Sequence, residues 1–219
     1  FPIFEKAQEL GVNLIGVHKG VPLGPQHIEH TQTWDMDGAA ENFPDINFVI
    51  YHVGLPFLDE TCWQLIRYPN LYASIAATVN FVVRAPRMFA EILGKLLFWC
   101  GEDKIIYGSE APLWHPQWAL RAFMDFQIPE DLCAGYGYPQ LTDQAKRKIL
   151  GENLLRLHGM DLVEARSRAA RPTSVAKPWP HHARPNIQPT SRWGQPSGYQ
   201  RPPRPTTVPV SFSSQVHMP

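Results

Sequence analysis

Three side chains that can bind a metal ion or transfer a proton each follow a short apolar run. His18 follows VNLIGV, His52 follows NFVIY, and Glu110 follows KIIY after two small residues, whereas a fourth run, LYASIA, has no such group. Imidazole and carboxylate are ligands that suit Zn²⁺ and similar divalent ions. Alone, a histidine at a strand end more often bonds a loop carbonyl, and a glutamate more often caps a helix. Three such ends together favour one shared site.

The apolar runs alternate with segments of helical periodicity, which would place their ends on one side of a sheet. Helices are expected from Pro2 to Gly11, from Met36 to Phe43, after a capping Asp59, from Pro86 to Gly101, from Ala119 to Phe126, and after a capping Thr142. Strands that are apolar throughout and separated by helices predict an α/β fold with a parallel sheet covered on both faces.

Four such repeats in the first 160 residues amount to half of a (β/α)8 TIM barrel, which typically has about 250 residues. We therefore predict the C-terminal half of a barrel, whose active site would lie at the carboxyl ends of the strands. An open doubly wound sheet is the alternative. The loop GVHKGVPLG lacks the G-x-G-x-x-G spacing of a dinucleotide site, which weakens that alternative.

The formal net charge of zero hides two different parts of the chain. Residues 1–165 hold all 20 acidic and 12 of the 20 basic residues, whereas residues 166–219 hold the other 8 basic residues and 11 of the 22 prolines. We predict a domain at 1–163 and a Pro-rich, basic, disordered tail at 164–219. The basic and aromatic residues of this tail are widely spread, so it is a poor candidate for binding nucleic acid.

Cysteine usage and hydropathy indicate the compartment. Cys62, Cys100 and Cys133 are far apart in sequence, which fits neither a disulfide framework nor a zinc knuckle and favours a cytoplasmic protein. The sequence has no run of 18 apolar residues, so we expect no membrane span. Because the sequence begins with Phe1 inside a helix-like stretch, we expect further coding sequence upstream.

The motifs LIGVHKG, NFVIYHVG and DKIIYGSEAP resemble, in this order, the fifth, sixth and eighth strand motifs of the amidohydrolase-related family. The segment KRKILGENLLRLHG is similar to the helix that ends the domain in that family. The family comprises metal-dependent TIM barrels, both hydrolases and nonoxidative decarboxylases such as aminocarboxymuconate-semialdehyde decarboxylase. The resemblance covers roughly residues 1–160.

The resemblance implies a role for each strand-end residue. His18 would be a metal ligand, and His52 would be the acid or base beside the ion. Glu110 stands where the family usually has Asp, and its carboxylate would complete the metal ligands of this segment. The implied cofactor is a divalent metal ion, zinc in the first instance. His115, just past the last strand end, is a candidate contact for a small-molecule substrate.

The expected activity is hydrolysis by metal-activated water, and the alternative is nonoxidative decarboxylation of an aromatic or unsaturated carboxylate. An inactive fragment or pseudoenzyme is a further alternative, because the sequence has no His-x-His pair like that of the family's first strand and has Glu for Asp. The HIEH stretch at 27–30 and the pair His181 and His182 are interpreted as surface. We therefore expect weak zinc binding, little turnover, and a homo-oligomer that covers open strand edges.

Overall fold

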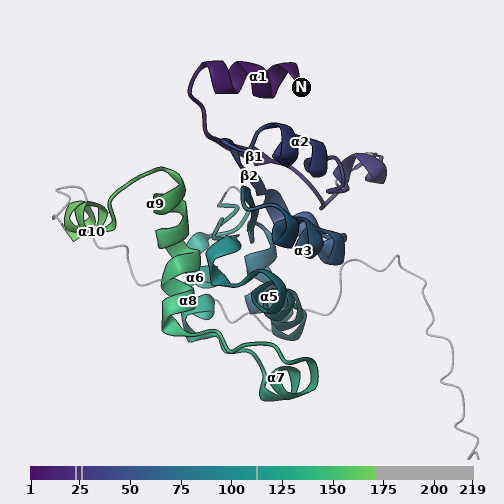
Figure 1. Cartoon of the computed structure of the whole chain (residues 1–219). Helices are drawn as coiled ribbons and strands as arrows, with labels where there is room; N and C mark the ends of the chain where they lie inside the picture. Colours follow the sequence, from purple (N-terminus) through teal and green to yellow (C-terminus); the bar gives the residue numbers. More distant parts are fainter. Residues whose placement is uncertain (23, 26, 112, 171–219) are drawn as a thin grey trace, which may run out of the picture. The chain divides into compact units, whose positions relative to one another are not determined.

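The computed structural model of the chain describes residues 1–22, 24–25, 27–111 and 113–170. Its centre is one parallel sheet (Figure 1). The strand order is β1-β2-β3-β4, so each strand pairs with the next along the chain. The strands are β1 (Leu14–Val17), β2 (Asn47–Ile50), β3 (Leu71–Ser74) and β4 (Ile105–Ile106). The predicted parallel α/β arrangement is confirmed.

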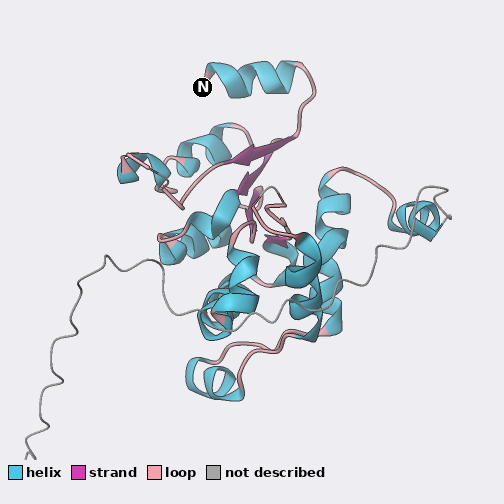
Figure 2. Cartoon of the chain, turned by 180° about the vertical axis from the view of Figure 1, so that it is seen from behind, coloured by secondary structure: helices cyan, strands magenta, loops and turns pink. Residues whose placement is uncertain are grey.

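Helices connect the strands and follow the last one (Figure 2). They are α1 (Pro2–Glu9), α2 (Met36–Asn42), α3 (Leu58–Arg67), α4 (Phe81–Arg84), α5 (Pro86–Cys100), α6 (Pro116–Asp125), α7 (Glu130–Tyr136), α8 (Asp143–Arg147), α9 (Asn153–Leu157) and α10 (Leu162–Ala170). A π-helical stretch, Lys148–Glu152, joins α8 to α9. In the described part of the chain, every helix is too short or too polar to cross a membrane.

The two faces of the sheet are covered to different extents. On β2, Phe48 and Ile50 are fully buried in the main core with apolar side chains of α2, α3 and α5. Val49, between them, belongs to a separate small cluster with Tyr72 of β3 and Leu157 of α9. Since successive strand residues point to opposite faces, the helices cover one face, and the other carries a thin apolar layer.

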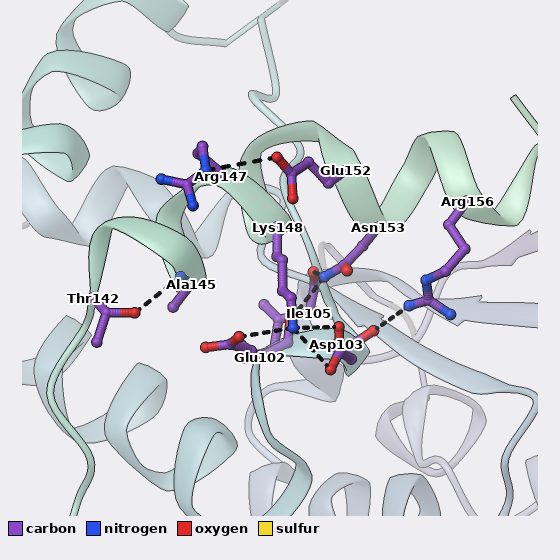
Figure 3. Close-up of polar contacts among 10 residues, drawn as sticks. All are labelled: Glu102, Asp103, Ile105, Thr142, Ala145, Arg147, Lys148, Glu152, Asn153 and Arg156. Carbon is purple, nitrogen blue, oxygen red and sulfur yellow. Dashed lines mark hydrogen bonds and ion pairs between the residues drawn. The ribbon is translucent and has the colours of Figure 1, made fainter. Parts of the chain in front are cut away.

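The C-terminal helical segment holds β4 in place (Figure 3). Asn153 is buried, and its Nδ2 donates hydrogen bonds to the carbonyl oxygens of Glu102 at 2.7 Å and Ile105 at 2.8 Å. Lys148 Nζ lies 2.8 Å from a Glu102 carboxylate oxygen and 3.0 Å from one of Asp103. These contacts fix the strand that leads to Glu110.

One of the two predicted helix caps is confirmed. Thr142 Oγ1 accepts a hydrogen bond from the Ala145 backbone N–H at 3.1 Å and begins α8. The prediction for Asp59 is wrong, because α3 begins after Phe57 without a side-chain cap. Asp59 instead accepts a 2.6 Å hydrogen bond from Lys95 of α5, and this bond raises the pKa of Lys95. Asp59 thus bonds a side chain of another helix and does not make the predicted capping bond within α3.

The domain boundary predicted at residue 164 falls inside α10. This helix has no buried side chain and ends the described part of the chain at Ala170. The predicted tail from 171 to 219, with His181 and His182, lies outside the described residues. The division into 1–163 and 164–219 therefore stays a prediction.

Candidate active site

His18, His52 and Glu110 lie close together at the carboxyl edge of the sheet. His18 directly follows β1, His52 lies in a 3₁₀ turn after β2 (Tyr51–Gly54), and Glu110 follows β4. The ring centroids of His18 and His52 are 4.8 Å apart, with the rings inclined at 73°. His52 Nδ1 and Glu110 Oε2 are 3.9 Å apart. His52 is thus the central member, with one neighbour after β1 and one after β4.

A backbone carbonyl fixes the ring of His52. Nδ1 lies 3.0 Å from the Ala76 carbonyl oxygen, and only 8% of the side chain is exposed. A carbonyl only accepts, so Nδ1 carries the hydrogen and Nε2 of the neutral ring keeps a lone pair for a proton or a metal ion. Ser74 Oγ in turn accepts from the Ala76 N–H at 3.2 Å. The strand that lacks an ionisable group at its end thus orients the histidine through its backbone.

Left-handed backbone occurs at two of the three strand ends. His52 has φ 58° and Val53 has φ 48°, and Glu110 has φ 53°. Such conformations cost on the order of 1–3 kcal/mol each for non-glycine residues and cluster at functional sites. At Glu110 the turn is closed by its carbonyl, which accepts from the backbone N–H groups of Leu113 and Trp114. The unusual backbone conformations thus occur at two residues that carry the candidate chemistry.

The loop after His18 is anchored, while His18 itself is exposed. Lys19 is buried, and its Nζ donates to Asp35 Oδ2 at 2.6 Å. Gly20 has φ +72°, and a Cβ there would lie 2.3 Å from the Leu55 carbonyl oxygen. Only glycine fits this close contact, which fixes the backbone after His18. The exposed imidazole of His18 remains accessible to a ligand.

His115 caps a helix. Its Nδ1 accepts a hydrogen bond from the Gln117 N–H at 3.3 Å at the start of α6, and its ring centroid lies 5.5 Å from that of Trp118. Its predicted substrate contact stays a prediction. His27 and His30 are exposed and 5.9 Å apart between ring centroids, at a distance in sequence from the strand ends.

The side chains of His18, His52 and Glu110 are of types that bind a divalent ion, but they do not form a preformed metal site. In the ranges that the structure describes, no three His, Cys, Asp or Glu side chains are grouped so that they could hold a metal ion. The His52 nitrogen that faces Glu110 is bonded to the Ala76 carbonyl. Metal binding would therefore require the exposed His18 and the partly exposed Glu110 to turn toward a common point.

Ala76 and Ser74 were missed by sequence reasoning. The contribution of Ala76 is a carbonyl oxygen, which every residue has, so no residue type could mark it. The available signal was that LYASIA lies between two strands with chemical groups at their ends. In a parallel sheet the end of that strand necessarily lies beside both neighbours.

Comparison with known proteins gives one family and one fold. A family model described as amidohydrolase matches residues 1–159. An uncharacterised TIM-barrel protein from Bordetella bronchiseptica is 22% identical with a TM-score of 0.51, over 72% of this chain and 49% of that one. The chain thus spans about half the length of that structure. The predicted TIM-barrel type of fold is confirmed.

Two further structures are less similar. A 2,6-dihydroxybenzoate decarboxylase from Rhizobium is 16% identical with a TM-score of 0.48, over 72% of this chain and 54% of that one. A Lactobacillus casei protein, whose name proposes a metal-dependent hydrolase, is 15% identical with a TM-score of 0.48, over 72% and 40%. No protein of curated function matches the sequence.

Proposed function

Because this chain belongs to the amidohydrolase family, we propose that its strand ends serve metal-dependent hydrolysis, with His18 and Glu110 holding a divalent ion and His52 transferring the proton. The observation that supports this proposal is the orientation of His52. Its Nδ1 is bonded to the Ala76 carbonyl and lies 3.9 Å from a Glu110 carboxylate oxygen, so Nε2 is the nitrogen left for proton transfer, on a ring whose centroid is 4.8 Å from that of His18.

The ion, when bound, would lower the pKa of a water molecule or polarise a substrate oxygen. His52 Nε2 accepts a proton from the attacking oxygen and returns it to the leaving group. The Ala76 carbonyl keeps the ring from rotating, and the Glu110 carboxylate, 3.9 Å from Nδ1, partly offsets the positive charge that the ring gains. Positioned acid–base catalysis of this kind contributes about 10²–10⁴-fold.

Zinc titration of the whole chain tests the metal assignment. The sequence has no His-x-His pair, so we expect weak binding of about one equivalent, measured by calorimetry. The substitutions His18→Ala and Glu110→Ala should each weaken that binding at least tenfold. The matched control is the double substitution of the exposed His27 and His30 by alanine, which should leave it unchanged. Binding that is lost in the control and kept in the other two would refute the assignment.

Product analysis with saturating zinc tests the reaction. Release of ammonia or alcohol would support hydrolysis, whereas release of CO₂ from an aromatic or unsaturated carboxylate would assign the same proton transfer to decarboxylation. In either case His52→Gln should reduce the rate about 100-fold or more while zinc affinity is retained, because the ring transfers the proton. Turnover that survives His52→Gln would exclude His52 as the acid or base.

A further inference from the structure

Tyr51 lies across β1 at a position that only glycine permits. A Cβ built on Gly16 would lie 2.2 Å from the Tyr51 hydroxyl oxygen and 2.5 Å from Cζ. Any side chain at position 16 would therefore displace the phenol ring. Glycine inside a strand lowers stability by roughly 0.5–1 kcal/mol relative to alanine, so the glycine that this contact requires destabilises the fold by that amount.

The phenol ring is on the sheet face that carries the site. Ile15 and Val17 pack against the main core under the helices, whereas Leu14 packs against the small cluster on the opposite face. Strand alternation places Gly16 on the same face as Leu14, with His18 two residues further on. The ring of Tyr51 lies on that face because it covers Gly16, which is two residues before His18 in the sequence.

Tyr51 is also adjacent to His52, and among the described residues its hydroxyl has no hydrogen-bond partner. The ring centroids of Tyr51 and His52 are 6.2 Å apart, and that of His18 is 4.8 Å from His52. Tyr51 is 40% exposed, and its hydroxyl makes no hydrogen bond to any residue that the structure describes. Neither burial nor a hydrogen bond to a described residue accounts for the position of this ring above Gly16.

We propose that Tyr51 contacts the substrate of this site, its hydroxyl donating a hydrogen bond to a substrate oxygen and its ring packing against a flat part of the molecule. This inference rests on the proposed function, because it takes His18 and His52 as the reacting end of the same site. The rings of Tyr51 and His18 each lie near that of His52, at 6.2 Å and 4.8 Å between centroids, and such flat surfaces suit a small planar oxyacid better than a bulky aliphatic one.

Benzoate is the probe, with cyclohexanecarboxylate as its non-planar counterpart, and both are measured by equilibrium dialysis against the zinc-loaded chain. We expect benzoate to bind more tightly than cyclohexanecarboxylate. Tyr51→Phe should weaken benzoate binding about three- to tenfold, the value of one lost neutral hydrogen bond. Gly16→Ala should weaken it similarly by displacing the ring with the hydroxyl intact. Tyr136→Phe, at an exposed tyrosine of α7, is the matched control and should have no effect.

Zinc affinity separates the two proposals. Tyr51 is not a ligand, so zinc affinity and melting temperature should be unchanged in Tyr51→Phe. Benzoate affinity that is unchanged in Tyr51→Phe, or no benzoate binding by a chain that binds zinc through His18, overturns the role of Tyr51 and leaves the proposed function intact. Absence of His18-dependent zinc binding overturns the proposed function itself. If Gly16→Ala fails to fold, Tyr51→Phe alone decides.

Discussion

Asn153→Ala should destabilise the fold by about 1.5–2.5 kcal/mol. The side chain is 1% exposed, and Nδ2 donates to two carbonyl oxygens at the start of β4, those of Glu102 and Ile105. Each lost hydrogen bond costs about 1 kcal/mol, and a carbonyl left buried and unbonded adds to this. The higher helix propensity of alanine returns about 0.5 kcal/mol. The loss should be greater than for an ordinary surface substitution because the amide joins α9 to the sheet.

Equilibrium unfolding in urea measures this loss, and Asn42→Ala is the matched control. Asn42 is also a helical asparagine whose Nδ2 donates to a backbone carbonyl, that of Gly38 at 2.7 Å, but it is exposed. The control should change the unfolding free energy by less than about 0.5 kcal/mol. Equal losses in the two variants, or a changed urea dependence in Asn153→Ala alone, would refute the view that burial makes the Asn153 contacts important.

Two further predictions concern stability. Burial lowers the pKa of Lys104 to about 8, whereas an unfolded lysine titrates near about 10.4, so the unfolded chain binds more protons between these values. The unfolding free energy of the wild type should therefore rise relative to that of Lys104→Met from pH 8 to pH 10. Lys104 Nζ donates hydrogen bonds to the backbone carbonyls of Tyr68 and Leu71, and a flat difference would show that these carbonyls keep the ammonium charged. Gly108→Ala should lower the unfolding free energy in urea by about 1–3 kcal/mol, because the new Cβ would lie 2.7 Å from that of Ala76. Gly151→Ala is the control and should be neutral or stabilising, because no atom lies within 4 Å of its Cβ position. Equal effects of the two substitutions would contradict this account.

The order of elements could be predicted because each has its own periodicity. The stripe on α5 is an example, since Phe89, Leu93 and Leu96 recur at helical spacing and are all fully buried. The strand ends could be located because apolar runs stop at His18 and His52. From parallel pairing alone, the proximity of these two side chains follows.

Contacts between distant segments could not be predicted. The hydrogen bond from His52 to Ala76 depends on the left-handed backbone at residues 52 and 53, which are not glycines and carry no local signal for that conformation. The contact of Tyr51 with Gly16 joins the turn after β2 to β1, and neither residue alone carries a signal for it in the sequence. The spacing of Leu150, Leu154 and Leu157 after Thr142 predicts one apolar helical face. Leu154 is nevertheless 37% exposed, because the π-helical stretch before α9 shifts the phase of the helix.

Anomalous diffraction from zinc-soaked crystals tests the central claim most directly. If His18, His52 and Glu110 form one metal-dependent site, a single zinc peak should lie about 2.0–2.2 Å from a nitrogen of His18 and an oxygen of Glu110, with His52 beside it. A peak at His27 and His30 instead, or no peak within reach of the three strand-end side chains, would contradict the claim.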